Sequence, residues 1–362
     1  MKILCVIDSL GPGGAQRQLV TLAKLWKQKG HEIRFLTYYR SDFFLPELLE
    51  QGIEVHTLQA RSYLERIYKM RKYIRREKQD VVLSFLDTPN FLCCFSAVGG
   101  KKWRLIISER SNKESHFKGV KFKIQKYFAR YADAIVCNSN SARQVWKKFY
   151  PSYISKLKTI YNTVLLPPVQ ARYSPWKDGK LHVLVAASYR QLKNMDGLIE
   201  GINLLSEEEK EKLEINWYGS KYAGDKNGSA YQRAEEKKHR YHLDSVIHFH
   251  EETGDIYTRM SQADCIGLFS KWEGLPNTIC EAMQLGKPVV MTKVSDYETL
   301  IDSDNGFLCD GNDPSDIRDA FRNLLHTNGQ QLKKMGEASR NKAERLFDIP
   351  VILEKWDQLF KI

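Results

Sequence analysis

The chain has no long hydrophobic run. No stretch reaches the roughly 18 to 20 consecutive apolar residues that a membrane-spanning helix needs, so the sequence predicts no such helix. The apolar run near the N-terminus is interrupted by Asp8 and continues into a helical pattern. We therefore expect a first β-strand here, in preference to the alternative of a signal peptide.

Cysteines are few and scattered. The seven lie inside apolar segments, without a Cys-x-x-Cys pair or a Cys/His cluster of metal-binding spacing. This placement is typical of reduced, buried core thiols in a cytoplasmic protein. They are Cys5, Cys93, Cys94, Cys137, Cys265, Cys280 and Cys309.

Two familiar ligand signatures are also missing. The loop Gly11-Pro12-Gly13-Gly14 lacks the Gly-x-Gly-x-x-Gly spacing of dinucleotide-binding enzymes, which argues against a dehydrogenase. Asp302-Ser303-Asp304 has an Asp-x-Asp spelling, but it follows a helical segment and is expected to begin a turn. We expect neither a metal nor a cofactor.

Length and periodicity indicate two α/β domains. The 362 residues, of which 42% are apolar and 28% charged, are long for one core. Short β-rich runs alternate with longer helical patterns, which predicts parallel, doubly wound sheets. Strands are expected in residues 2–8, 31–38, 53–58, 80–86, 104–109, 134–139, 181–188, 214–219, 245–250, 264–270, 287–292 and 306–310.

The alternation stops over residues 162–179, a proline-containing segment without clear periodicity, where we place a linker. The predicted domains are residues 1–166 and 167–346, with a helix at 347–362 ending the chain.

Positive charge is in excess and concentrated. The net charge is +12, and basic residues interleaved with aromatics gather in residues 61–78 and 101–130. Such segments suit an anionic membrane surface or an anionic substrate. A solvated helical face is the alternative for each, and no recognition motif for nucleic acid accompanies them. The basic residues include Arg61, Arg66, Lys69, Arg71, Lys72, Arg75, Arg76, Lys78, Lys113, Lys118, Lys121, Lys123 and Lys126.

Two short motifs follow predicted strands. Glycines at Gly13 and Gly14 allow a ligand to approach the backbone, and the following helix offers unpaired N–H groups to an anion; a tight turn without a ligand is the alternative. Arg190 and Lys193 stand ahead of another helix, where two cations suit a diphosphate; ordinary surface charge is the alternative.

The strongest motif runs from Ser270 to Met283 and continues as Gly286-Lys287-Pro288-Val289-Val290. Glu273 lies in a Gly/Pro loop and Glu281 in a helix that is expected to start near Asn277. Carboxylates accept hydrogen bonds from vicinal hydroxyls, and the loop can offer N–H groups to a phosphate. The acid/base pair of a glycosidase is the rival interpretation, which the second cationic motif disfavours.

These residues resemble the signature of glycosyltransferase family 4, retaining enzymes of the GT-B fold, which has two Rossmann-like domains facing a cleft. The resemblance covers nearly the whole chain. Besides the motif of Glu273 and Glu281, it includes the Gly-Gly loop followed by Ala15-Gln16-Arg17, the linker Ile160-Tyr161-Asn162, and the terminal helix, which in this family crosses back to the N-terminal domain.

The resemblance implies a role for each matched residue. Glu281 would bind the donor ribose and Glu273 the donor sugar. Arg190 and Lys193 would neutralise the diphosphate. The amides of Gly274 and Leu275, in the loop that ends at Pro276 and Asn277, would meet the sugar or diphosphate, and the backbone of Gly13 and Gly14 would close over it.

The chain departs from the family pattern at two places. The usual Arg five residues before the Lys is Ser188 here, and Arg190 is a substitute. Where many members carry a His, this chain has Glu109 and Arg110, which with Arg17 are candidate sugar or acceptor contacts; a structural ion pair is the alternative. His116, nearby, is interpreted as a surface residue.

The implied reaction moves a sugar from a nucleotide sugar, most commonly a UDP-sugar, to an acceptor hydroxyl with retention and without a metal. The N-terminal domain generally contacts the acceptor in this fold. Its basic segments therefore suggest a lipid-linked oligosaccharide of a bacterial surface polysaccharide, and a cytoplasmic enzyme attached peripherally to the inner face of the membrane. A sugar-nucleotide epimerase and a non-catalytic binding subunit are the rival functions.

Overall fold

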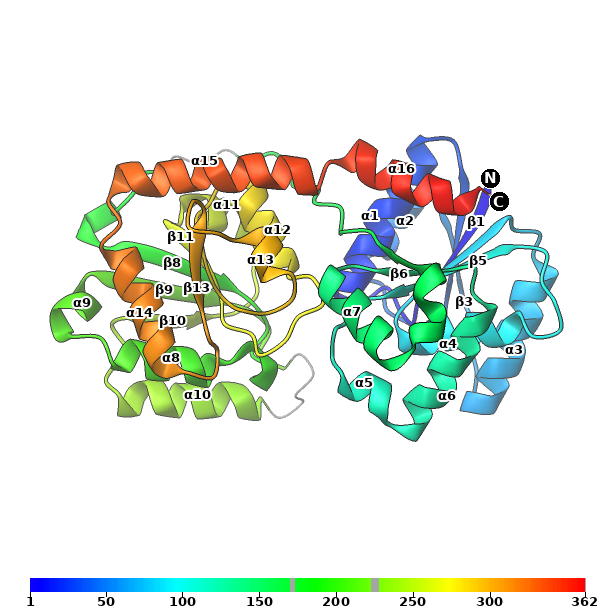
Figure 1. Ribbon diagram of the computed structural model, residues 1–362, viewed down its shortest axis with the longest axis horizontal. Coiled ribbons are helices and arrows are strands. Elements are labelled where there is room, and N and C mark those ends of the chain that lie inside the picture. The colour runs from blue at the N-terminus through cyan, green and yellow to red at the C-terminus, as the bar shows by residue number, and fades with distance from the viewer. Residues whose placement is uncertain (170–172, 223–227, 362) are drawn as a thin grey trace. The chain divides into compact units, whose positions relative to one another are not determined.

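The chain divides into two compact units. The computed structural model describes residues 1–169, 173–222 and 228–361. Unit 1 comprises Met1–Thr163 and Ile349–Ile362, and unit 2 comprises Val164–Asp348 (Figure 1). Residues 160–169 have no regular secondary structure, and the predicted boundary after residue 166 falls among them. Residues 170–172 of the predicted linker lie outside the described residues.

Unit 1 is built on a seven-stranded parallel sheet in the order β3-β2-β1-β4-β5-β6-β7. The three-residue strand β7 was not predicted, because so short a segment carries no periodicity. The strands are β1 (Lys2–Val6), β2 (Glu32–Thr37), β3 (Glu54–Thr57), β4 (Val81–Phe85), β5 (Arg104–Glu109), β6 (Ala134–Cys137) and β7 (Leu157–Thr159).

Helices of unit 1 cover both faces of this sheet, as expected when crossover connections join parallel strands. They are α1 (Gly14–Gln28), α2 (Leu45–Glu50), α3 (Tyr63–Arg76), α4 (Asp87–Ser96), α5 (Ser115–Lys118), α6 (Val120–Phe128), α7 (Asn140–Phe149) and α16 (Ile349–Phe360), with 3₁₀ turns at Ala129–Tyr131 and Pro151–Lys156.

The last helix belongs to unit 1 although it follows unit 2 in the sequence. Trp356 and Phe360 of α16 pack edge-on against Trp26 of α1, with ring centroids 5.8 and 5.1 Å away. The side chain of Arg104 in β5 donates a 2.7 Å hydrogen bond to the carbonyl of Leu359. Aromatic burial therefore fixes this helix on the unit 1 core.

Unit 2 repeats the plan with a six-stranded parallel sheet in the order β10-β9-β8-β11-β12-β13. Its strands are β8 (Leu181–Ala186), β9 (Leu213–Tyr218), β10 (Ile247–His250), β11 (Cys265–Leu268), β12 (Val289–Thr292) and β13 (Gly306–Cys309). Its helices are α8 (Met195–Asn203), α9 (Glu207–Glu211), α10 (Ser229–Arg240), α11 (Ile256–Gln262), α12 (Asn277–Gln284), α13 (Tyr297–Leu300), α14 (Pro314–Leu325) and α15 (Gly329–Leu346), with 3₁₀ turns at Lys177–Gly179 and Gln191–Lys193.

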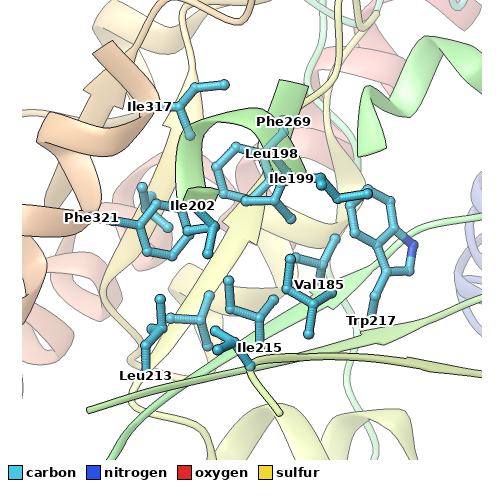
Figure 2. Close-up of a cluster of buried hydrophobic side chains, with 14 of the residues drawn as sticks. Val185, Leu198, Ile199, Ile202, Leu213, Ile215, Trp217, Phe269, Ile317 and Phe321 are labelled. Carbon is cyan, nitrogen blue, oxygen red and sulfur yellow. The ribbon is translucent and has the colours of Figure 1, made fainter. Parts of the chain in front are cut away.

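The core of unit 2 is a continuous apolar layer between sheet and helices. Figure 2 shows Leu198 and Ile202 of α8 packed among Ile317 and Phe321 of α14 and the side chains of the strands, Val185 among them. All seven cysteines of the chain are buried free thiols that form no disulfide, as predicted. The predicted α/β class, with doubly wound parallel sheets, is confirmed in both units.

Each sheet reverses its strand order once. In unit 1 the reversal lies between β1 and β4, and in unit 2 between β8 and β11. Ligands of open α/β sheets bind outside the carboxyl ends of the strands at such a reversal. The Gly-Gly loop follows β1, the loop of Arg190 and Lys193 follows β8, and the loop of Glu273 follows β11. The topology thus places three sequence motifs at these two points.

Candidate functional site

Two loops of unit 2 meet at the strand-order reversal. The backbone N–H of Lys271, after β11, donates to the carbonyl of Leu192, after β8, at 2.8 Å. The hydroxyl of Thr278, in the first turn of α12, donates to the carbonyl of Ala186 at the end of β8, at 3.0 Å. These bonds hold the second and third sequence motifs together at one edge of the sheet.

The ammonium of Lys193 meets the carboxylate of Glu273 at 2.5 Å. Glu273 also accepts a 2.7 Å hydrogen bond from the hydroxyl of Ser270, whose carbonyl in turn accepts one from the hydroxyl of Thr292. The side chains of Lys193 and Glu273 are 19% and 15% exposed. The hydrogen bond from Ser270 therefore holds the carboxylate of Glu273 in place, while both side chains stay partly exposed, so a ligand can reach both charges.

The helix α12 begins beside this pair without a side-chain cap. Its N-cap is Pro276, which supplies no side-chain hydrogen bond, and its first turn carries no acidic residue. The first backbone N–H groups of such a helix lack intrahelical acceptors and favour an anion. The carbonyl of Gly274 accepts a hydrogen bond from the hydroxyl of Ser295, and Leu275 is buried, so the loop before the helix is also fixed.

Glu281 lies in the second turn of α12 and is half-buried. The hydroxyl of Tyr257, on α11, donates to its carboxylate at 3.3 Å. Glu273 lies in the loop before α12 and Glu281 within the helix, so the two carboxylates belong to different segments of the motif. The prediction that Glu281 lies in a helix starting near Asn277 is confirmed.

The loop after β8 presents its two cations differently. Lys193 ends a 3₁₀ turn and is followed by Asn194 in the left-handed conformation, φ 62°, with its side-chain amide donating to the carbonyl of Gly311 at 2.8 Å. Arg190 is exposed, and among the described residues its guanidinium has no side-chain hydrogen bond or ion pair. Its role toward a diphosphate stays a prediction.

In unit 1, Gly13 is the N-cap of α1, which has neither a side-chain cap nor an acidic residue in its first turn. Asp8, after β1, accepts a 3.0 Å hydrogen bond from the side chain of Gln16. A Cβ atom on Gly13 would lie 2.2 Å from an oxygen of that side chain. Gly14 and Arg17 are exposed on the first turn of the same helix.

Gln18 is a residue that sequence reasoning missed. It is 5% exposed, and its amide both donates to and accepts from the backbone of Thr163, at 2.7 and 2.9 Å. It thereby ties α1 to the last residue of the first segment of unit 1. Its polar type at a buried helix position was the available signal.

Glu109 is a buried structural residue, which corrects the expectation of a sugar or acceptor contact. It is 4% exposed, forms an ion pair with Lys126 of α6, and accepts a 3.2 Å hydrogen bond from the indole of Trp146. Lys126 also meets Asp87 at 2.7 Å. Burial raises the pKa of Glu109, and the cation of Lys126 opposes it. Burial alone would raise the pKa of Asp87, but Lys126 and His116 hold it well below its usual range.

Arg110 lies beside this cluster and is also held within unit 1. Its guanidinium donates to the side chain of Asn162 and covers the ring of Phe85 at 4.5 Å. Burial lowers its pKa to about 9, with Glu109 opposing. His116, expected to be a surface residue, keeps 32% of its side-chain surface in solvent, with its Nδ1 atom 3.2 Å from the carboxylate of Asp87 and its ring stacked on Phe122.

No metal centre emerges from the described side chains, since no group of three or more His, Cys, Asp or Glu is arranged to hold an ion among them. Asp302 and Asp304 form a turn, as expected, in which the N–H of Asp304 donates to the carboxylate of Asp302. Within the described segments, no helix is both long and apolar enough to cross a bilayer.

Comparison with protein families matches nearly the whole chain. The family described as Glycosyltransferase Family 4 matches residues 12–166, and the family described as glycosyl transferases group 1 matches residues 170–342. The chain is a glycosyltransferase of the family 4 type. The resemblance noted in the sequence is therefore confirmed, and the enzyme's two matched segments correspond to its two Rossmann-like units.

Curated relatives of this glycosyltransferase include two Campylobacter jejuni enzymes. One, a GalNAc-α-(1→4)-GalNAc-α-(1→3)-diNAcBac-PP-undecaprenol α-1,4-N-acetyl-D-galactosaminyltransferase, is 32% identical over 45% of this chain and 46% of its own length. The other, an N-acetylgalactosamine-N,N′-diacetylbacillosaminyl-diphospho-undecaprenol 4-α-N-acetylgalactosaminyltransferase, is 22% identical over 95% of this chain and 94% of its own. The chain thus spans just under half of the first relative.

Among solved structures, Anabaena Alr3699/HepE in complex with UDP-glucose is 18% identical, with a TM-score of 0.84 over 99% of this chain and 98% of that one. Staphylococcus aureus TarM is 13% identical, with a TM-score of 0.80 over 100% and 99%. These likenesses show that the glycosyltransferase has the GT-B fold.

Proposed function

We propose that this glycosyltransferase takes a sugar from a nucleotide-diphosphate sugar and transfers it to an acceptor hydroxyl, retaining the anomeric configuration and using no metal. The observation that carries the proposal is the partly exposed pair of Lys193 and Glu273, next to the start of α12, which has no side-chain cap, at the strand-order reversal of unit 2. A cation, backbone N–H groups and carboxylates gathered in one place match the phosphates and hydroxyls of such a donor.

Each group has a distinct task in the transfer. When the anomeric C–O bond breaks, negative charge grows on the leaving diphosphate. Lys193, Arg190 and the amides of Gly274 and Leu275 stabilise that charge, and electrostatic stabilisation of this kind contributes most of the rate enhancement in many group transfers. Glu281 accepts hydrogen bonds from the ribose hydroxyls, and Glu273 from the hydroxyls of the sugar. The proton of the acceptor hydroxyl goes to the departing phosphate oxygen.

The Gly-Gly loop of unit 1 contributes to donor binding through backbone alone. Gly13 and Gly14 begin α1 without a side-chain cap, so their N–H groups are directed at the carboxyl edge of the sheet. Arg17, one turn into the helix, serves the sugar or the acceptor.

A UDP-sugar is the donor we propose, supported by the UDP-glucose complex of the structurally similar HepE. A lipid-linked oligosaccharide is the acceptor we propose, supported by the undecaprenol-linked substrates named for both Campylobacter relatives. Such an acceptor fits a cytoplasmic enzyme bound peripherally to the inner face of the membrane and engaged in surface polysaccharide synthesis.

A donor screen tests this proposal. The purified protein is mixed with each nucleotide sugar and with membrane extract as the source of acceptor, and release of free nucleotide is measured. One donor should be consumed, and Lys193→Ala and Glu281→Ala should each lower kcat/KM about 100-fold or more. Lys212→Ala, which removes an exposed lysine directly after α9 that is paired with Glu208, is the matched control and should keep full activity.

Other outcomes distinguish the rival functions. Full activity of both site variants would refute the site assignment. Donor conversion without an acceptor and without transferred product would indicate an epimerase, and donor binding without turnover over a range of acceptors would indicate a non-catalytic subunit.

A further inference from the structure

Helix α6 carries an apolar stripe on its exposed side. Val120 is 75% exposed, Ile124 52% and Tyr127 51%, at the i, i+4, i+7 spacing of one helical face. An exposed face of a surface helix is normally polar, because only the inward stripe packs on the core. The inward side of α6 is occupied by Gln125 and the buried Lys126. Within the stripe, the ring of Tyr127 lies under the guanidinium of Arg130 at 4.0 Å and meets the ring of Phe128 edge-on at 5.7 Å, while Val120 and Ile124 lie mostly in solvent.

Helix α3 repeats this arrangement. Leu64 is 77% exposed and Tyr68 65% exposed, one turn apart, while Met70 and Ile74 are fully buried on the opposite face. The stripe of α3 continues into Lys72, whose ammonium lies 6.0 Å from the ring of Tyr68.

The two helices lie on one face of the unit 1 sheet, on either side of α4 (Figure 1). Arg71 of α3 reaches the ring of Phe95 in α4 at 5.7 Å, and that ring packs against Phe128 of α6 at 5.6 Å. The exposed stripes of α3 and α6 thus flank a single layer of three helices. We call the exposed side chains of this layer, Leu64, Tyr68, Lys72, Val120, Lys121, Lys123, Ile124 and Tyr127, the α3/α6 face.

Some basic residues of this region have structural tasks and are not part of the α3/α6 face. The guanidinium of Arg71 donates to the carbonyls of Phe95 and Ser96 at 2.8 and 3.1 Å. Arg75 donates to the carbonyls of Ser96 and Gly100 at 3.1 and 2.8 Å. Together they donate to carbonyl groups at and just beyond the C-terminus of α4, where the helix itself supplies few donors.

The remaining cations of the face are exposed and have no described acidic partner. Lys121 and Lys123 alternate with the apolar stripe of α6, a helix that contains no acidic residue. On α3 the one acidic side chain, Glu65, is paired with Lys69 at 2.7 Å. Exposed apolar side chains surrounded by unpaired cations are the composition of a surface that lies in a membrane interface.

We propose that the α3/α6 face docks on an anionic phospholipid bilayer, with the apolar side chains entering the interface and Lys72, Lys121 and Lys123 contacting lipid phosphates. The inference rests on the proposed function and deepens it by naming the surface that brings the enzyme to a lipid-linked acceptor. The positive charge argues against a second copy of the chain as the occupant, because two such faces would repel each other.

Vesicle co-sedimentation of the full chain tests the face without donor or acceptor, so its outcome is independent of the transfer reaction. We expect binding to vesicles of phosphatidylglycerol and phosphatidylcholine, and little binding to phosphatidylcholine alone. Lys121→Gln/Lys123→Gln should weaken binding about tenfold or more, since each lysine near an anionic surface contributes a several-fold gain in affinity. Ile124→Ser/Tyr127→Ser should weaken it to a similar degree and leave less salt-resistant binding.

Matched controls lie in unit 2. Lys333→Gln/Lys334→Gln removes two exposed lysines of α15, and Leu204→Ser removes a side chain that is 44% exposed; both should bind vesicles like the wild type. Equal binding of wild-type protein to neutral and anionic vesicles, or undiminished binding of both α6 variants, would overturn the proposal. A change in oligomeric state of the α6 variants with unchanged vesicle binding would also overturn it and identify a protein partner instead.

Discussion

Unit 1 and unit 2 share a parallel sheet with one strand-order reversal, yet the charges at their carboxyl edges are used in different ways. In unit 1, Glu109 and Lys126 are 4% exposed and surrounded by Asp87 and Trp146. In unit 2, Lys193 and Glu273 keep 19% and 15% of their surface in solvent. The same topology therefore yields an internal ionic cluster in one unit and an accessible, charged site in the other.

The difference teaches that ion-pair geometry does not identify a functional site by itself. Both pairs are close contacts between a lysine and a glutamate, Lys126 on helix α6 with Glu109 at the end of β5, and Lys193 with Glu273 in the loops after β8 and β11. Separating a buried ion pair is costly, because it leaves two charges without water or protein partners. The charges of a partly exposed pair can separate at lower cost and interact with a ligand instead. Accessibility to a ligand distinguishes the two, and only the tertiary structure contains it.

Removing the lysine of each pair should give the largest difference in unfolding free energy between the two units. Lys126→Met leaves the buried carboxylate of Glu109 without its cation and should lower the free energy of unfolding by about 3–5 kcal/mol. Lys193→Met should lower it by less than about 1 kcal/mol, because solvent can replace the lost partner. Urea denaturation monitored by circular dichroism and fluorescence measures both.

A double variant tests whether Lys126 and Glu109 stabilise the fold through their direct interaction. If Lys126 and Glu109 act as a pair, Lys126→Met/Glu109→Met should lose less stability than the sum of the two single variants. Equal losses for Lys126→Met and Lys193→Met would show that the two pairs do not differ as we infer.

Loss of the hydrogen bonds between the side chain of Gln18 and the backbone of Thr163 is expected to have the next largest effect on the free energy of unfolding. Gln18→Leu leaves the backbone N–H and carbonyl of Thr163 without their partners and should lower the unfolding free energy by about 2–3 kcal/mol. Gln28→Leu, at an exposed position of the same helix, is the control and should change it by less than about 0.5 kcal/mol. If Gln18→Leu were as stable as Gln28→Leu, water would have to replace the lost hydrogen bonds to the N–H and carbonyl of Thr163.

The smallest effect concerns Lys287 of unit 2, which is 3% exposed and donates to the carbonyl of Ala263 at 2.9 Å. Burial lowers its pKa to about 8, with Asp264 opposing. Between about pH 8 and its usual pKa, the unfolded chain holds a proton on Lys287 that the folded chain has released, so stability rises with pH.

Comparison with Lys287→Met isolates this effect from other titrating groups. The stability of the wild type relative to the variant should increase by about 1 kcal/mol from pH 8 to pH 9. A difference that stays constant across this range would show that Lys287 keeps its proton in the folded protein.

Much of the fold was predictable because its signals are local. All the strands expected from β-rich runs are present, and the start of α12 lies where the Gly/Pro loop ends. The strand β7 was missed because three residues carry no pattern. Of the site, the loops of Lys193 and Glu273 were found by their motifs, whereas Thr292 and Tyr257 were not, since each acts through a contact between distant segments.

The basic segments show where prediction from charge alone reaches its limit. Sequence marks Arg71, Arg75, Lys121 and Lys123 as one kind of residue. In the structure, the two arginines satisfy backbone carbonyls of α4, and the two lysines point to solvent. Hydrogen-bond partners far along the chain decide which charges are available to a ligand or a membrane.

By itself, the sequence determined the α/β class, the family and the motif of Glu273 and Glu281, because these depend on local periodicity and on residue spacing. Only the tertiary structure decided that Glu109 is an internal ion-pair partner and that Lys193 meets Glu273 at an accessible edge. The physical reason is that burial and electrostatic environment depend on neighbours brought together by the sheet, and residue order along the chain does not specify how much water remains around a charge.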